Sequence, residues 1–462
     1  MLYQWLLIIA SSLILLAVTP WAKTVGEFFR GERQTEGKPT RLPNAWVLTS
    51  SLVISWLFAK SITNAANLGL DFGLVGGVAY AAYYVSFLVA GWVLYRMRTR
   101  GGFESIHQFL QSRFGRGALM IFSLLIAFRL FNEVWSNTKV IGTYFGPDGS
   151  SGFVWSIIVF TALTLAYSLK GGMSSSILTD VIQMVLFGVL LVVVLGAVLQ
   201  SSNIPTIKSN DVGAYLSSGT WAMSQGGNLL VIALIQSFSY PFHDPVLTDR
   251  GFISDPKTML RSFMWAAPVG GICIVLFSFV GIFGQFQGVT GQAPVEVAKL
   301  LGPVIMLVMN FIMITSAAST LDSTFSSFAK MTVVDLGKPE KVTVSRGRWA
   351  MVMVTLLGSI PIFLGAEILT ATTVSGTMVI GLAPVFTLWW LKAPPLSFYL
   401  SVGLGILLGI ILVLGTWPED WHFTTGKYDA MLSVNLIGTL ACYVVFLLPW
   451  LLKRGSIPES KV

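Results

Sequence analysis

A stripe of hydroxyl side chains with one carboxylate runs through residues 311–335, inside a stretch that is otherwise apolar. Its polar residues recur in steps of three, four and one, which places them on one face of a helix. They are Thr315, Ser316, Ser319, Asp322, Ser323, Ser326, Ser327 and Lys330. Oxygen atoms at such a spacing can bind Na⁺, and the Ile312 carbonyl with the Thr315 and Ser316 hydroxyls offers three ligands. The alternative is close helix packing, in which small hydroxyl residues are common.

Ionisable side chains also occur in other apolar stretches. They are Lys60, Arg129, Glu133, Asp180, His243, Asp244 and Asp322. A charge at bilayer depth costs about 2.5–3.5 kcal/mol on insertion scales, so each needs a partner or a role. Arg129 and Glu133 are one helical turn apart and can pair with each other. Asp180 either stabilises the start of its own helix through the helix dipole or reaches the hydroxyl stripe.

The composition is that of an integral membrane protein. Hydrophobic residues make up 54% of the 462 residues and charged residues 11%, and the mean hydropathy is +0.75. Apolar runs of 18 or more residues recur along the whole chain, which predicts helices that cross a bilayer. Cys273 and Cys442 lie inside apolar runs, and the three histidines lack metal-ligand spacing. A disulfide framework and a transition-metal site are therefore not indicated.

Thirteen transmembrane helices are predicted. They cover residues 2–22, 45–67, 70–95, 117–145, 153–169, 174–199, 225–247, 259–285, 302–334, 346–366, 370–391, 396–416 and 431–453. With the N-terminus outside and the C-terminus in the cytoplasm, 23 Lys and Arg residues fall on the inner side and 3 on the outer side. This bias follows the positive-inside rule. It accounts for the net charge of +8 without nucleic-acid binding.

Two of these spans are interrupted by residues that break helices. The second span contains the sequence from Trp56 to Ser61, followed by Thr63 and Asn64, near its middle, and a break there would free carbonyl oxygens around residues 54–57. The seventh span contains the sequence from Ser239 to Pro245, with two prolines. The interruptions are five spans apart. Broken helices at matching positions of two halves indicate a transporter built from inverted repeats, with its site near the midplane.

Several motifs resemble those of one family. Residues 171–183 (GGMSSSILTDVIQ) and 315–323 (TSAASTLDS) carry the resemblance, with weaker support from residues 109–115 and from the Asp249–Arg250 pair. They are similar to the motifs of the sodium:solute symporters, which include bacterial proline, sugar and sialic-acid symporters and the animal sodium–glucose transporters. The resemblance extends over roughly residues 44–392 and implies a LeuT-type fold with a 5+5 inverted repeat.

The resemblance implies a sodium site between the first broken helix and the hydroxyl stripe. Its ligands would be the carbonyl oxygens of Ile54, Leu57 and Ile312 and the hydroxyls of Thr315 and Ser316. Asp180 and Ser319 would support this site. Some family members hold a second sodium nearby, but here Ala318 stands where one of its hydroxyls would be, so a single ion is expected.

The substrate pocket of sugar-transporting members matches Lys60, Ser61, Tyr80, Tyr83, Glu133 and Tyr240, with Tyr240 as an aromatic inner gate. Lys60 and Glu133 depart from the family pattern, and three hypotheses follow. Lys60 binds a substrate carboxylate; or it pairs with Glu133 beside a neutral solute; or its ammonium replaces a cation, which would make transport sodium-independent or proton-linked.

The sequence therefore predicts an all-α, multi-pass protein of the cell membrane. Residues 1–43 would form an N-terminal helix and a cytoplasmic loop, 44–200 and 201–392 the two repeats, and 393–462 peripheral helices with a short tail. The predicted function is sodium-coupled symport of a small polar, carboxylate-bearing or neutral solute, with Na⁺ as coupling ion and no other cofactor. The alternatives are the Lys60-dependent transporter above and a non-transporting sensor; no nucleophile–base pair suggests an enzyme.

Overall fold

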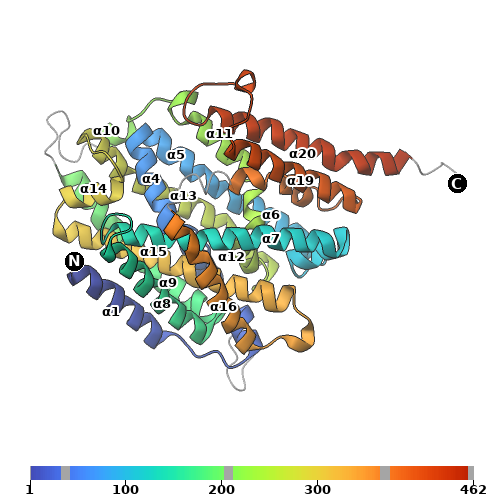
Figure 1. Cartoon of the computed structure of the whole chain (residues 1–462), viewed down its shortest axis with the longest axis horizontal. Coiled ribbons are helices and arrows are strands. Elements are labelled where there is room, and N and C mark those ends of the chain that lie inside the picture. The colour runs from blue at the N-terminus through green and yellow to red at the C-terminus, as the bar shows by residue number, and fades with distance from the viewer. Residues whose placement is uncertain (1, 33–41, 202–211, 365–374, 456–462) are drawn as a thin grey trace.

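The computed structural model describes residues 2–32, 42–201, 212–364 and 375–455, and within these ranges the chain is helical without β-strands (Figure 1). Among the described residues, eight helices are long and apolar enough to cross a membrane, and counting one bent helix pair as a span gives nine. Each of the thirteen predicted spans overlaps helical structure. The number of full spans is smaller than predicted because α1 (Leu2–Val18) has only 17 residues and several other spans are broken or end early.

The first repeat predicted from the sequence contains the first broken helix. Its segments α3 (Ala45–Trp56) and α4 (Ala59–Phe72) meet at an angle of 62°. The helices that follow are α5 (Leu74–Ala81), α6 (Val85–Thr99), α7 (Ile106–Thr143), α8 (Ser151–Gly171) and α9 (Met173–Gln200). A short helix α2 (Val25–Arg30) precedes them and packs on α9.

The second predicted repeat, residues 201–392, includes the short helix α10 (Val212–Leu216). Its broken span consists of α11 (Gly227–Gln236), the 3₁₀ turn η3 (Tyr240–His243) and α12 (Pro245–Arg250). It continues with α13 (Pro256–Phe286), α14 (Ala293–Leu300), α15 (Pro303–Lys330), α16 (Val344–Ser359) and α18 (Leu382–Thr387). Residues 365–366 and 370–374 of two predicted spans lie outside the described residues.

Two helices follow the repeats, α19 (Pro395–Val413) and α20 (Asp429–Gly455). They pack against each other at one edge of the bundle, and α1 lies along the opposite edge beside α8 (Figure 1). Although α19 and α20 lie at the edge, α20 also packs on the broken helix α11. One helix of this C-terminal pair therefore contacts a helix of the candidate site.

Close backbone contact holds the first broken helix in place. A Cβ atom on Gly281 of α13 would lie 1.7 Å from the Ala66 carbonyl oxygen, and one on Gly69 of α4 would lie 2.3 Å from the Ser278 carbonyl oxygen. Only glycine allows two helix backbones to approach so closely, a packing mode that is common in membranes. The α4 half is therefore fixed against α13, and bending at the break is confined to the residues around Leu57.

Candidate sodium and solute site

The break in the first broken helix exposes backbone oxygen atoms. The Leu57 N–H still bonds the Val53 carbonyl at 2.9 Å, and the ladder resumes where the Ile62 N–H bonds the Phe58 carbonyl at 3.0 Å. Between them, no backbone donor of the described residues is recorded for the carbonyl oxygens of Ile54 and Leu57. Both residues are fully buried. The two carbonyls proposed as sodium ligands are thus available for a cation.

The hydroxyl stripe lies on α15, which packs on α3. Thr315 Oγ1 donates to the helix carbonyls of Phe311 (3.0 Å) or Ile312 (2.9 Å). Ser316 Oγ is completely buried and has no hydrogen-bond partner among the described residues. A buried hydroxyl without a partner is unfavourable by about 1–3 kcal/mol, and a cation ligated by its oxygen would remove that penalty. The oxygen-rich donor set fits Na⁺.

Asp180 joins the two broken helices to the stripe. Its Oδ2 accepts from Ser51 Oγ of α3 at 2.5 Å and from Arg250 Nη2 of α12 at 2.8 Å, and its Oδ1 accepts from Ser319 Oγ of α15 at 2.5 Å. Of the two roles considered for Asp180, the structure therefore shows contact with the stripe. Asp180 lies two turns into α9 and does not cap it.

Arg250 occupies the centre of this polar cluster. Its side chain is fully buried, and besides Asp180 it donates to Ser51 Oγ (2.6 Å), Ser323 Oγ (2.9 Å) and the Val246 carbonyl (2.8 Å). The count of 23 basic residues on the inner side includes Arg250, between the predicted spans 225–247 and 259–285, but the structure buries this side chain inside the protein. The six-residue helix α12 carries it back into the protein, and its charge neutralises Asp180.

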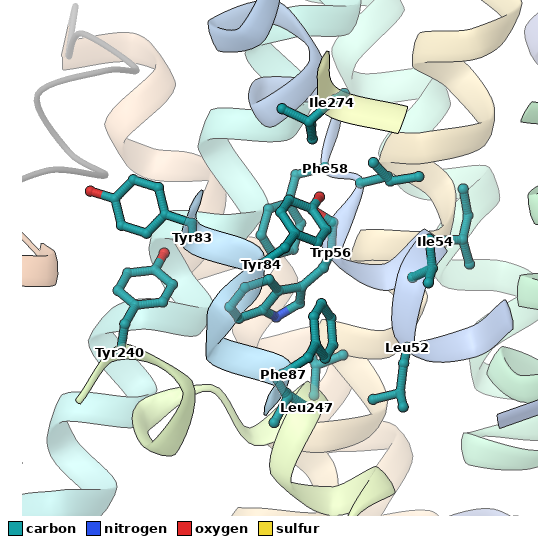
Figure 2. Packing of buried hydrophobic residues seen from close by; sticks show 14 of the residues in the cluster. Leu52, Ile54, Trp56, Phe58, Tyr83, Tyr84, Phe87, Tyr240, Leu247 and Ile274 are labelled. Atoms are coloured by element: carbon teal, nitrogen blue, oxygen red, sulfur yellow. The ribbon is translucent and has the colours of Figure 1, made fainter. Parts of the chain in front are cut away.

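An aromatic cavity lies where the two broken helices meet. The cavity has a volume of about 20 Å³. That is room for about one water molecule. Its lining residues are Trp56, Phe58, Ser61, Tyr80, Tyr83, Tyr84 and Tyr240. Figure 2 shows Trp56 among Tyr84 and Phe87, with Tyr83 and Tyr240 beside them.

Four of the predicted substrate residues line this cavity, namely Ser61, Tyr80, Tyr83 and Tyr240. Tyr80 donates to Ser61 Oγ at 3.1 Å, and the rings of Tyr83 and Tyr240 have their centroids 5.9 Å apart. The other two predicted residues, Lys60 and Glu133, do not line the cavity and bind each other instead. The distance from Lys60 Nζ to Glu133 Oε2 is 2.8 Å.

Lys60 and Glu133 belong to a buried network of two cations and two anions. Arg129 Nη2 lies 3.2 Å from Glu133 Oε1, as the spacing of these two residues predicted, and 2.6 Å from Asp244 Oδ2. Arg129 Nη1 donates to the Tyr240 hydroxyl at 2.6 Å. All four charged side chains are at most 2% exposed. The network has no net charge, which is the condition for burying it.

Asp244 connects the two breaks. It accepts from the Val246 and Leu247 N–H groups at the start of α12 and from Trp56 Nε1 of the first broken helix, the latter at 2.6 Å. The Trp56 carbonyl in turn accepts from the Tyr84 hydroxyl at 2.9 Å. At the two breaks, the ends of both broken helices therefore meet in one cluster of polar contacts.

A hydrogen-bond relay leads from the cavity to the last helix. The Tyr83 hydroxyl donates to Gln236 Oε1 at 3.0 Å, and Gln236 Nε2 donates to Asn435 Oδ1 of α20 at 2.9 Å. Sequence reasoning missed Gln236 and Asn435, along with Ser51 and Ser55. Gln236 could have been found from its place four residues before Tyr240 in a broken helix. Asn435 gave no signal beyond being an amide in an apolar run.

Comparisons with known proteins agree with this architecture. No family model matches the chain. A stretch of 184 residues is 26% identical to sodium/glucose cotransporter 1 of Oryctolagus cuniculus, and one of 190 residues is 26% identical to solute carrier family 5 member 4A of Mus musculus. Each match covers 37% of this chain and 26% of the relative. The chain thus spans about a quarter of the length of the curated relatives it matches.

Solved structures are similar over nearly the whole chain. A Na⁺-coupled sialic acid symporter in a substrate-bound outward-open state superposes with a TM-score of 0.70 at 15% identity, covering 100% of this chain and 99% of the other. Mhp1, a nucleobase-cation-symport-1 family transporter in a closed conformation, gives 0.56 at 11% identity, with 94% and 95% covered. The fold is of the LeuT type, and the resemblance of this chain to the sodium:solute symporters is confirmed.

Proposed function

We propose that the protein is a sodium-coupled symporter that moves a small polar solute without net charge across the cell membrane by alternating access. The observation that carries this proposal is the junction of the two broken helices. Trp56 and Tyr240 meet at the aromatic cavity, with ring centroids 5.9 Å apart, and Asp244 bonds Trp56 across the junction. A site at the meeting point of two discontinuous helices is the arrangement by which such carriers expose a solute to one side at a time.

The proposed sodium ligands are the carbonyl oxygens of Ile54, Leu57 and Ile312 and the hydroxyls of Thr315 and Ser316. The unpartnered Ser316 hydroxyl and the carbonyls freed by the break support this assignment. Asp180 and Ser319 hold the first broken helix to α15 beside this site. Sodium binding would draw α3 and α15 together in the outward-open state.

The pairing of charges favours a solute without net charge. Lys60 and Arg129 each have an anionic partner within 2.8 Å, so a substrate carboxylate would have to displace Glu133 or Asp244. Of the three hypotheses for Lys60, pairing with Glu133 agrees best with this geometry. The cavity offers hydroxyls and aromatic faces, which suit a neutral or zwitterionic solute with hydroxyl, amine or amide groups.

Uptake into proteoliposomes tests the proposal. A thermal-shift screen of amino acids, organic acids, sugars and nucleobases, with Na⁺ and with K⁺ as the control, would first identify the solute. We expect that a net-neutral solute stabilises the protein only with Na⁺ and accumulates in vesicles under an inward sodium gradient. A ligand that raises the melting temperature but does not accumulate would favour the sensor. Binding of anions alone, abolished in Lys60→Ala, would favour a carboxylate substrate.

The driving force is sufficient for such transport. One sodium ion entering down a membrane potential of 100 mV supplies about 2.3 kcal/mol. A tenfold sodium gradient adds about 1.4 kcal/mol, since each 1.4 kcal/mol corresponds to a factor of ten. One ion could thus support an accumulation of roughly several hundred-fold for a neutral solute. Vesicles with neither a sodium gradient nor a membrane potential should show no accumulation.

A further inference from the structure

Asp322 is a buried carboxylate in α15 that the proposed sodium site does not use. Its side chain is fully buried. Its contacts are hydroxyl groups: Ser176 Oγ lies 2.9 Å from Oδ1, Thr179 Oγ1 lies 2.8 Å from Oδ2, and Ser323 Oγ lies 3.3 Å from Oδ1. Asp322 therefore has hydrogen-bonding partners on α9 and on its own helix.

No counterion is paired with Asp322. The titratable groups that face it from neighbouring helices are Asp180 of α9, Arg250 of α12 and Tyr167 of α8, and α3 presents only hydroxyls. Arg250 forms its ion pair with Asp180, and no basic side chain of the described residues forms one with Asp322. The three charged groups therefore sum to one negative charge. A carboxylate buried in this way normally binds a cation or becomes protonated.

The hydrogen-bond geometry around Asp322 fits a proton. Thr179 has a single hydroxyl hydrogen, and its Oγ1 lies 3.1 Å and 3.0 Å from the carbonyl oxygens of Ser175 and Ser176. If that hydrogen bonds a helix carbonyl, the 2.8 Å contact to Asp322 Oδ2 needs a hydrogen from the acid. A neutral carboxylic acid supplies it and removes the uncompensated charge.

Two further polar side chains lie close to Asp322. Gln183 lies one turn beyond Thr179 on α9 and is 1% exposed. The Tyr167 hydroxyl, which donates to the Ala318 carbonyl at 3.1 Å, interacts with the side chains of both Gln183 and Asp322. Neither of these neighbours carries a positive charge that would compensate a charged Asp322.

Polar residues on one face of α15 lead from Asp322 towards an open vestibule. Asp322, Ser326 and Lys330 follow one another at steps of four on the same face of α15, over about 12 Å of helix. Ser326 Oγ is buried without a recorded partner in the described chain. Lys330 lines a vestibule of about 1000 Å³ together with Asp249 and Asp335. The vestibule lies at the predicted cytoplasmic end of α15.

We propose that Asp322 is a proton-binding site that exchanges with the vestibule along the Ser326 face of α15. A proton from water binds Oδ2, and the charge of the side chain changes from −1 to zero. If the symport proposed above is correct, this proton is a second coupled cation in a protein whose Ala318 lacks the hydroxyl for a second sodium. Proton binding itself does not depend on that symport.

Infrared difference spectroscopy of the purified protein tests the site without a solute. We expect a carbonyl stretch of a protonated, buried carboxyl group that titrates with pH, shifts in D₂O and is absent in Asp322→Asn. Asp71→Asn, at an exposed aspartate, should retain the band. The band should persist in saturating Na⁺, with K⁺ as control. A band that survives in Asp322→Asn, no such band in the wild type, or its complete loss on adding Na⁺ would each overturn the proposal.

Thr179→Val keeps the proposal testable if Asp322→Asn does not fold. This variant preserves the shape of the side chain and removes the proposed acceptor of the acid hydrogen. The midpoint of the titrating band should move to lower pH by about one unit, corresponding to the loss of one hydrogen bond of the neutral acid. An unchanged midpoint, or one that moves to higher pH, would contradict the assignment. Neither outcome would affect the sodium-coupled uptake experiment, so failures of the two proposals can be told apart.

Discussion

At the scale of single residues, Ser316 is the sharpest indicator of an ion site. Thr315 can satisfy its hydroxyl on its own helix, whereas Ser316 Oγ is buried with no recorded partner in the described chain. The sequence pattern alone does not distinguish Thr315 from Ser316, because both hydroxyl residues lie on the same face of the predicted helix. Their difference emerges only when the neighbouring helices are in place.

Ser316→Ala is expected to weaken sodium binding. Removing one of five proposed ligands should raise the half-saturating Na⁺ concentration about tenfold, corresponding to about 1.4 kcal/mol. Thr315→Ala should have a similar effect. The measurement is the rise in melting temperature of the purified protein with increasing NaCl at constant ionic strength. Ser397→Ala, which removes another buried hydroxyl without a recorded partner, should leave the sodium dependence unchanged. Unaltered sodium dependence in both site variants would refute the ligand assignment.

The pair of Lys60 and Glu133 should behave as a unit. Lys60→Met leaves a net negative charge in the buried network and is expected to destabilise the protein by about 3–5 kcal/mol. Adding Glu133→Gln restores neutrality, and the double variant should recover most of the lost stability. Thermal unfolding of the two single variants and the double variant gives the coupling free energy. Additive losses would show that the two charges do not depend on each other.

At the scale of elements, one glycine shapes the motif on which the family resemblance rests. Gly172 ends α8 and precedes α9 with a φ of 56°, a conformation that favours glycine. A Cβ atom there would lie 2.4 Å from the Phe28 carbonyl oxygen. This tight turn lets α9 run back along α8 and sets the direction from which Asp180 approaches α15. The glycine is thus explained by geometry and not by contact with an ion.

Gly172→Ala is expected to destabilise the protein by about 1–3 kcal/mol through backbone strain. Gly188→Ala in the same helix is the matched control, because a Cβ atom there meets nothing within 4 Å. Alanine is also the better helix former, so this control should be neutral or slightly more stable. The measurement is the melting temperature of each variant, compared with that of the unmodified protein in the same detergent. Equal losses in both would show that the turn at Gly172 is not strained by a side chain.

Much of the fold could be predicted because membrane helices leave strong local signals. Apolar length placed the helices, and Pro241 and Pro245 marked the second break directly. The stretch Trp56–Ser61 marked the first break, and the structure has its bend there, between Trp56 and Ala59. The buried position of Arg250 could not be predicted from sequence, because a basic residue that follows a broken helix is normally expected in a solvent-exposed loop. In the structure, Arg250 belongs to the short helix α12 and is buried. Pairings such as Asp180 with Arg250 depend on helices far apart in sequence.

At the scale of the whole molecule, sodium should change access to the vestibule. In a background with Cys273 and Cys442 replaced by alanine, a cysteine at Gln108 on the vestibule wall reports this access. If sodium stabilises the outward-open state, labelling of Gln108→Cys by a polar maleimide should slow several-fold in NaCl relative to KCl. A cysteine at exposed Thr220 should react at the same rate in both salts. Faster labelling of Gln108→Cys in sodium would mean that the ion opens the inner side.

The hydrogen-bond relay from Tyr83 through Gln236 to Asn435 affects how much of the chain can be removed without changing the cavity. Asn435 belongs to α20, which lies outside the repeats predicted for residues 44–392, yet through Gln236 it orients a hydroxyl in the cavity wall. A carrier shortened to the repeats alone would keep both helix breaks but lose the partner that fixes the Gln236 amide. Engineering a minimal carrier from this chain, or exchanging its C-terminal helices with those of a relative, would therefore alter which solute it accepts.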